Sequence, residues 1–287
     1  MDGRLAHWPE NERVACLELA LLPGSVFEAV FRFLPGGLAS RALASEALFR
    51  SVMDVPRLSS DPGVAVAKLS WWQTALPRAL EEGSQHPVIS AALRLGVLQS
   101  MKMTEWSAFV MQVSKRIEED PVSSADEWLQ RFESIEGKRL LLEDGGADEG
   151  VRRWLQAVGS ATGLLDQLSR LCLPGNAVTA VPLDLVARHQ LGGSEPAARN
   201  SALAELAQAG VASIQAVPRP ETSALAGQSV GAIADITGAV VEKRLAWLAA
   251  QAAETQPPAP PTASLGEVWQ TWKAARRHAR HFPHSDE

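Results

Sequence analysis

One predicted helical face brings acidic and basic side chains together. Glu46, Arg50 and Asp54 recur every four residues, a spacing that places side chains on the same face of an α-helix. Two carboxylates four residues apart on such a face could chelate a divalent cation such as Mg²⁺. Here an arginine stands between the two acids, so the series predicts a ladder of salt bridges rather than a chelating pair.

A second acidic pair has the four-residue spacing of a helical metal site, but the residues between the two acids do not favour a helix. Asp144 and Asp148 are four residues apart, yet Gly145 and Gly146 lie between them. Adjacent glycines disfavour a helix. The segment is therefore predicted to be a solvated acidic loop rather than a metal site.

Cysteine and histidine chemistry has little support in the sequence. Cys16 and Cys172 lack the spacing of zinc ligands, so we expect two reduced thiols. His86 precedes a proline and is expected to begin a helix. His278 and His281 could bind a metal weakly, but in such a tail we expect them to be solvated. No spacing marks a catalytic triad.

The chain that carries these residues has helical periodicity throughout, and no run alternates convincingly as a strand. We therefore predict an all-α protein, a single-domain helical bundle whose helices end at proline and glycine signals. The predicted helices span about residues 9–22, 25–34, 38–55, 62–82, 86–98, 104–118, 124–136, 151–173, 183–189, 195–217 and 222–254.

A proline-rich stretch divides the chain. Residues 1–254 are predicted to form the helical domain, residues 255–264 a Pro-rich linker, and residues 265–287 a basic tail. We expect the tail to pack Trp269 and Trp272 on the body and to leave its basic face in solvent. The alternative is a tail that binds an anionic membrane surface or a protein partner.

Composition excludes several classes of protein. With 287 residues, 46% hydrophobic and 21% charged, the chain has an ordinary globular composition. A net charge of −6 argues against binding to nucleic acid. No apolar run approaches the ~20 residues of a membrane span, and the N-terminus lacks the layout of a signal peptide. We expect a cytoplasmic protein that could also touch a membrane from its surface.

The predicted 62–82 helix contains two adjacent tryptophans, Trp71 and Trp72, which cannot both face the same side. We expect one to enter the core and the other to line a groove or meet a second helix. The stretch from Ser59 to Trp72, with Gln85-His86-Pro87-Val88, resembles the squalene/phytoene synthase family. The shared features are a turn, an aliphatic helix, the Lys68-Leu69-Ser70-Trp71-Trp72 segment and a His-Pro that opens the next helix.

The likeness is strongest to a divergent branch near the complex I assembly factor with a phytoene-synthase-like domain. Weaker likeness runs from about residue 25 to 250. The resemblance implies the helical fold of isoprenoid synthases. It also implies two acidic clusters that hold Mg²⁺ ions against a diphosphate, so that the metal neutralises the leaving group.

The resemblance places the first cluster near residues 46–54 and the second near residues 159–170. In the second segment Arg170 stands where the first aspartate would be, and Asp166 lies four residues before it. A Leu-Pro turn of the family resembles residues 181–184, which include Asp184. Neither Mg²⁺ cluster is preserved.

Three functions stay open. The first is a degenerate relative without Mg²⁺-dependent prenyl transfer, which holds an isoprenoid or lipid ligand or serves as an assembly scaffold. The second is an active prenyltransferase that joins prenyl diphosphates head to head with Mg²⁺ as cofactor and displaced carboxylates as catalytic residues. The third is a helical protein-interaction module that binds through its tail. The catalytic candidates for the second function are Glu46, Asp54, Asp166 and Asp184.

For the first function, the 38–55, 62–82 and 151–173 helices are expected to wall a pocket. Its basic side chains would meet a phosphate or acidic head group without a metal. The expected ligand-binding residues are Arg50, Lys68, Trp71, Trp72 and Arg170.

Overall fold

The computed structural model describes residues 5, 7–118, 121–143, 147–172, 181–191, 196–225, 229–253 and 264–278. Within these ranges the chain forms helices and turns and contains no strand. The predicted all-α class is confirmed.

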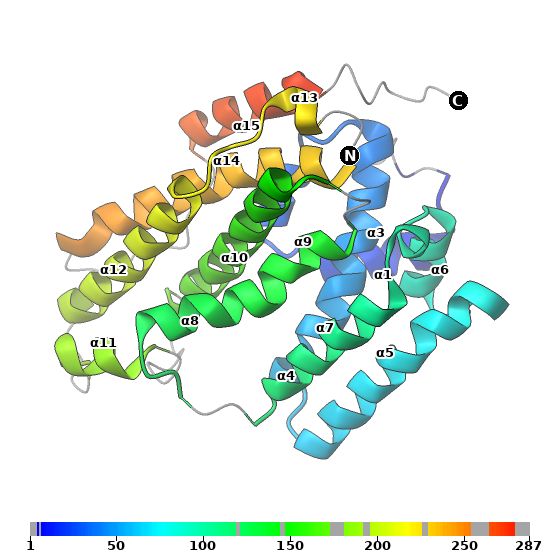
Figure 1. The fold of residues 1–287 in the computed structure, drawn as a ribbon, viewed down its shortest axis with the longest axis horizontal. Helices are drawn as coiled ribbons and strands as arrows, with labels where there is room; N and C mark the ends of the chain where they lie inside the picture. Colours follow the sequence, from blue (N-terminus) through cyan, green and yellow to red (C-terminus); the bar gives the residue numbers. More distant parts are fainter. Residues whose placement is uncertain are drawn as a thin grey trace.

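The helices are arranged around two long central ones, α3 and α10 (Figure 1). In chain order they are α1 (Glu10–Ala20), α2 (Val26–Phe31), α3 (Gly36–Met53), α4 (Val55–Leu58), α5 (Pro62–Glu82), α6 (Pro87–Arg94), η2 (Leu98–Ser100), α7 (Met103–Lys115), α8 (Ala125–Phe132), η3 (Glu133–Gly137), α9 (Lys138–Leu142), α10 (Glu149–Leu171), α11 (Leu183–Arg188), α12 (Pro196–Gln215), α13 (Thr222–Leu225), α14 (Ser229–Ala249), η5 (Ala250–Ala253) and α15 (Leu265–His278).

The two central helices have different neighbours. Helix α10 packs against α8, η3 and α9 on one side and against α12 and α14 on the other, whereas α3 contacts α1, α2, α6 and α7. Helix α5 packs on α7 at one edge of the molecule, and α15 packs on α14 at another (Figure 1). Burial of leucines and aromatic rings holds this arrangement together. For example, Phe49 of α3 meets the rings of Trp106 and Phe109 of α7 at 6.1 and 5.5 Å.

Several helix ends follow their local signals, and other elements differ from the prediction. The 62–82 helix forms as expected, and the Asp61 carboxylate accepts a hydrogen bond from the Val64 amide at its start. Helix α3 ends at Met53, just before the predicted end at residue 55, and Pro56 lies in the first turn of α4, where its missing N–H leaves no bond unmade. The predicted 124–136 helix divides into α8 and the π-helical turn η3. In the 222–254 segment the structure describes α13, α14 and η5, and residues 226–228 and 254 lie outside the described ranges.

The adjacent tryptophans separate as expected. Trp72 is 5% exposed and lies in the core, where its carbonyl accepts a hydrogen bond from the Trp106 indole N–H. Trp71 is 46% exposed and contacts the rings of Trp72 and His86. His86 is the residue that precedes α6, as predicted.

The tail differs from its prediction. Helix α15 does pack on α14, but Trp269 and Trp272 are 52% and 37% exposed. The expectation that both rings pack on the body is wrong, because the inner face of α15 carries Glu267 and His278, which pair with buried groups of α14. The proposed linker, apart from Ser264, and the Asp144-Gly145-Gly146 part of the acidic loop lie outside the described residues.

Candidate functional site

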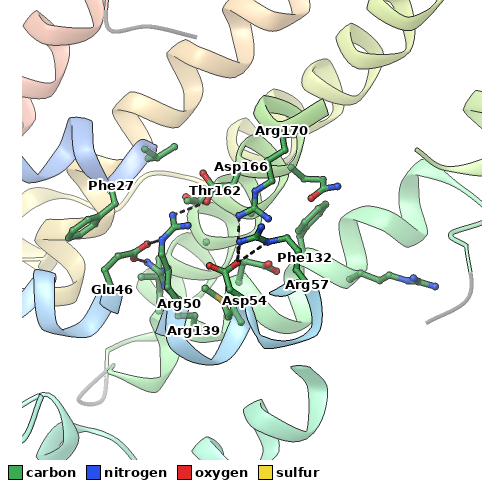
Figure 2. A pocket seen from close by; sticks show the side chains of 18 of the residues that line it. Phe27, Glu46, Arg50, Asp54, Arg57, Phe132, Arg139, Thr162, Asp166 and Arg170 are labelled. Atoms are coloured by element: carbon green, nitrogen blue, oxygen red, sulfur yellow. Dashed lines mark hydrogen bonds and ion pairs between the residues drawn. The ribbon is translucent and has the colours of Figure 1, made fainter. Parts of the chain in front are cut away.

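A cavity of about 370 Å³ lies between α2, α3, α4, α8, η3, α9, α10 and α14 (Figure 2). Aromatic and aliphatic side chains such as Phe27, Phe132 and Ile233 form its apolar part. Six arginines and four carboxylates also line it, so the lining has a formal charge of +2. These charged residues are Arg50, Arg57, Arg116, Arg131, Arg139, Arg170, Glu46, Asp54, Glu136 and Asp166.

Glu46, on α3, is bound by two guanidinium groups. Its Oε1 accepts a hydrogen bond from Arg50 Nε at 2.6 Å, and its Oε2 lies 2.6 Å from Arg139 Nη2. The residue is only 2% exposed. Burial alone would raise the pKa of Glu46, but the charges of Arg139 and Arg50 outweigh it and hold the pKa below its usual value. Glu46 is therefore a buried anion held between two cations.

Arg50 connects α3 to α10. Its Nη2 donates to Asp166 at 3.0 Å while its Nε stays on Glu46, as Figure 2 shows. Burial lowers the pKa of this guanidinium, but the Glu46 and Asp166 carboxylates raise it above its ordinary value. Arg50 thus occupies the place between two carboxylates where a bridging cation would otherwise sit.

A second cluster lies at the end of α3. Asp54 Oδ1 is 3.1 Å from Arg57 Nη2 and 3.7 Å from Arg170 Nη2. Burial lowers the pKa of Arg170, and the nearby Arg57 and Arg50 act in the same direction against the effect of Asp166 and Asp54. Burial therefore works against the charged form of Arg170, and an anion entering the cavity beside it would stabilise that form.

The opposite wall carries two further ion pairs. Arg116, which directly follows α7, makes a bidentate pair with Glu136, with both N–O distances at 2.9 Å. Arg131 donates to Glu127 at 2.8 Å. The Arg116 guanidinium also lies 5.8 Å from the centre of the Phe132 ring. Charged and apolar surfaces therefore alternate along this wall.

Close contact between backbones positions Glu136. It lies in η3, the π-helical turn that crosses α10 at three glycines, Gly137, Gly159 and Gly163. A Cβ atom at Gly159 would lie 2.3 Å from the Glu136 carbonyl oxygen, and one at Gly137 would lie 2.7 Å from Ser160 Oγ. Only glycine permits this approach. Single π-helical turns are frequent at functional sites, and this one holds the Glu136 carboxylate against the cavity.

The structure brings five of the nine predicted site residues to the cavity: Glu46, Asp54, Asp166, Arg50 and Arg170 all line it. The other four lie elsewhere. Lys68 is exposed on α5, with Ser59 Oγ at 3.4 Å, and Trp71 and Trp72 lie on the same helix. Asp184 lies on α11 and pairs with Arg188 at 3.4 Å. The 62–82 helix does not wall this cavity, since α5 packs on α7 and contributes no lining residue.

The predicted ladder forms in part. Glu46 and Arg50 pair as expected, but Arg50 turns its second donor across to Asp166 on α10, and Asp54 pairs with Arg57 and Arg170 instead. Helical spacing showed which side chains share a face of α3, but it could not show that a second charged helix lies opposite.

The sequence reasoning missed Arg57, Arg116, Arg131, Arg139 and Glu136. They come from five separate parts of the chain, so no spacing pattern connects them. The one available signal was that Arg116, Arg131 and Arg139 each belong to segments whose apolar residues predict a buried helical face.

The carboxylates of the cavity do not fit the Mg²⁺ clusters that the resemblance implies. Mg²⁺ requires oxygen ligands free to complete an octahedron, whereas Glu46, Asp54 and Asp166 are each engaged by arginine. Among the described residues, no group of three or more His, Cys, Asp or Glu side chains is arranged to hold a metal ion.

No protein-family model and no curated protein matches the sequence. The structure, in contrast, is similar to the crystal structure of a dehydrosqualene synthase in complex with ligand. The TM-score is 0.65 at 13% sequence identity, and the match covers 95% of this chain and 98% of that chain. At this identity the likeness shows the fold alone. The chain has the all-α fold of squalene/phytoene-type synthases, while its place in the divergent branch stays a prediction.

Proposed function

We propose that this protein binds an isoprenoid or another lipid with an anionic head group in the cavity without Mg²⁺, and that it does not carry out Mg²⁺-dependent prenyl transfer. The observation that supports this most is the pairing of Glu46, Asp54 and Asp166 with arginines. In the proposal these guanidinium groups take the part that metal ions play in the synthases that the sequence resembles.

The head group is assigned to the end of the cavity near Arg57 and Arg170. Both are within ion-pair distance of the Asp54 carboxylate, and the cavity lining as a whole contains two more arginines than carboxylates. Arginine binds phosphate through paired, charge-assisted hydrogen bonds. The apolar chain would then lie along Phe27, Phe132 and Ile233. The cavity volume lies at the lower end of the range typical of small-molecule pockets.

Calorimetric titration with farnesyl diphosphate tests the binding site. Replacing Arg170 with glutamine removes one charged hydrogen-bond donor, which we expect to weaken binding by roughly 10-fold or more. The control is Arg78→Gln on α5, an exposed arginine paired with Glu82 far from the cavity lining. Equal affinity of the two variants would contradict the assigned site.

Product analysis tests the absence of prenyl transfer. Incubation of the protein with farnesyl diphosphate and Mg²⁺ should yield no coupled product and release no diphosphate above a protein-free control. Formation of a coupled product would favour the active prenyltransferase, and the Glu46, Asp54 and Asp166 carboxylates would then be reassigned to catalysis.

A further inference from the structure

Helix α15 is fixed to the body by its polar side. Glu267 accepts hydrogen bonds from Arg244 Nε and Nη2 at 3.0 and 2.9 Å, and both side chains are 4% exposed. At the C-terminal end of the same helix, His278 Nε2 lies 3.0 Å from Asp235 Oδ2. Thr271 lies between these two anchors and is buried. The rotation of α15 about its own axis is therefore set by ion pairs.

The opposite side of α15 presents large side chains to solvent. We call Val268, Trp269, Trp272, Lys273 and Arg276 the outer face of α15. Its two indole rings stack on each other, with centroids 4.9 Å apart and planes 18° from parallel. Lys273 Nζ lies 5.1 Å from the Trp269 ring, and the Arg276 guanidinium lies 4.8 Å from the Trp272 ring.

This arrangement reverses the usual one. A surface helix of a globular protein normally buries its large apolar side chains and exposes its charged ones. Here the buried side carries a glutamate, a threonine and a histidine together with two small alanines, while Trp269 and Trp272 are 52% and 37% exposed. Such an exposed apolar surface, rimmed by charge, marks an interaction site.

The outer face of α15 is also positively charged. Within the part of the chain that the structure describes, Lys273 and Arg276 have no acidic side chain within ion-pair distance, and the acid of this helix, Glu267, is neutralised internally by Arg244. The whole chain carries a net charge of −6. The positive charge of this face is therefore local, and it complements a negatively charged partner.

We propose that the outer face of α15 binds the surface of an anionic lipid bilayer. Trp269 and Trp272 would enter the head-group region, where tryptophan is enriched in membrane proteins. Lys273 and Arg276 would pair with lipid phosphates, as basic side chains of interfacial helices do. None of the described helices combines the length and apolar character needed to cross a membrane, so this attachment is peripheral.

A second copy of the chain fits this face less well. A twofold interface centred on the outer face would bring its lysine and arginine toward the same residues of the other copy, and like charges would oppose each other. Helix α15 lies at the rim of the bundle (Figure 1), and all five side chains of its outer face are exposed.

Vesicle flotation of the full chain tests the proposal. We expect the protein to float with vesicles that contain phosphatidylglycerol, to float less with pure phosphatidylcholine vesicles, and to be released by salt. The Lys273→Gln/Arg276→Gln variant should bind phosphatidylglycerol vesicles roughly 30-fold more weakly, since each basic residue near such a surface contributes a several-fold factor. The Trp269→Ser/Trp272→Ser variant should lose most of its binding to the same vesicles.

A matched control tests whether binding requires the outer face of α15 or only an exposed tryptophan and an exposed arginine anywhere on the surface. Trp71→Ser/Arg78→Gln changes an exposed tryptophan and an exposed arginine on α5, and it should float like the unchanged protein. The proposal is overturned if the unchanged protein does not float with anionic vesicles, or if the α5 variant loses as much binding as the α15 variants. It is also overturned if size-exclusion chromatography shows a dimer that the Trp269→Ser/Trp272→Ser change dissociates, because a second copy then covers the face.

Discussion

The buried carboxylates of the cavity are paired with arginines. Glu46 is almost fully buried between Arg50 and Arg139, an arrangement that requires the carboxylate to stay charged. Acids that serve as metal ligands repel one another before the metal arrives, whereas acids paired with arginine already contribute to the stability of the protein without ligand. The two roles therefore predict opposite effects on the free energy of unfolding when such a carboxylate is replaced by an uncharged amide.

Replacing Glu46 with glutamine should lower the free energy of unfolding by about 3 kcal/mol, because two guanidinium groups lose their shared buried anion. Urea unfolding of the variant without ligand measures this. Glu82→Gln on α5 is the control, since its side chain is 57% exposed and its pair with Arg78 contributes little. A Glu46→Gln protein as stable as the unchanged one, or more stable, would instead be typical of a metal ligand.

At the scale of single residues, sequence reasoning located both charged segments of the cavity and could not locate their partners. The α-helical spacing of Glu46, Arg50 and Asp54 is a local property, and the Glu46–Arg50 pair follows from it. The pairs of Arg50 with Asp166 and of Arg170 with Asp54 join α3 to α10 across more than 100 residues of chain. Such contacts depend on how the helices pack, and periodicity carries no information about this.

At the scale of elements, the crossing of η3 with α10 shapes the cavity wall. A methyl group at Gly159 would meet the backbone of Glu136, which cannot move independently of the turn. We expect Gly159→Ala to lower the free energy of unfolding by about 1–3 kcal/mol through overpacking, despite the better helix propensity of alanine. Thermal and urea unfolding measure the loss.

The control for this crossing is Gly266→Ala in α15, where an added Cβ meets nothing closer than 3.8 Å. That substitution should be neutral or slightly stabilising. If Gly159→Ala left the free energy of unfolding equally unchanged, that result would contradict the close approach of η3 to α10.

The contact between α14 and α15 should make the stability of the protein depend on pH in the acid range. Burial works against the charged form of Asp235, but His278, Arg219 and Arg277 lower its pKa to about 2. Because this folded-state pKa lies below the ordinary value of about 4, the stabilisation is complete above pH ~4 and is lost as the pH falls toward 2.

The Asp235→Asn variant should therefore be less stable than the unchanged protein at neutral pH, and the difference should shrink between about pH 4 and pH 2. Urea unfolding at a series of pH values measures this difference. Asp126→Asn, at an exposed position of α8, should leave the profile unchanged. A constant difference across the acid range would show that the charge of Asp235 does not fix α15.

The predicted helix boundaries agree with the structure where they depend on neighbouring residues, and they differ where they depend on contacts with distant parts of the chain. The Asp61-Pro62-Gly63 turn predicts the start of α5, and the carboxylate cap confirms it. The division of the 124–136 segment into α8 and η3 depends on glycines of α10 more than 20 residues away. The tail was misjudged for a similar reason, because its amphipathic pattern does not reveal that Arg244 and Asp235 bind its polar side.

At the scale of the whole molecule, the fold and the site support different conclusions. The bundle matches a dehydrosqualene synthase over 95% of the chain. Fold does not establish activity, because the chemistry depends on particular side chains. In this cavity those side chains are arginine–carboxylate pairs, and the excess of arginine favours an anionic ligand over a metal ion.

The dissociation constant of farnesyl diphosphate, measured by calorimetry once with Mg²⁺ and once with EDTA, tests the central claim most directly. If guanidinium groups take the part of the metal, the ligand should bind with the same dissociation constant in both buffers. Binding in Mg²⁺ that disappears in EDTA would contradict the claim, and so would the absence of binding in either buffer.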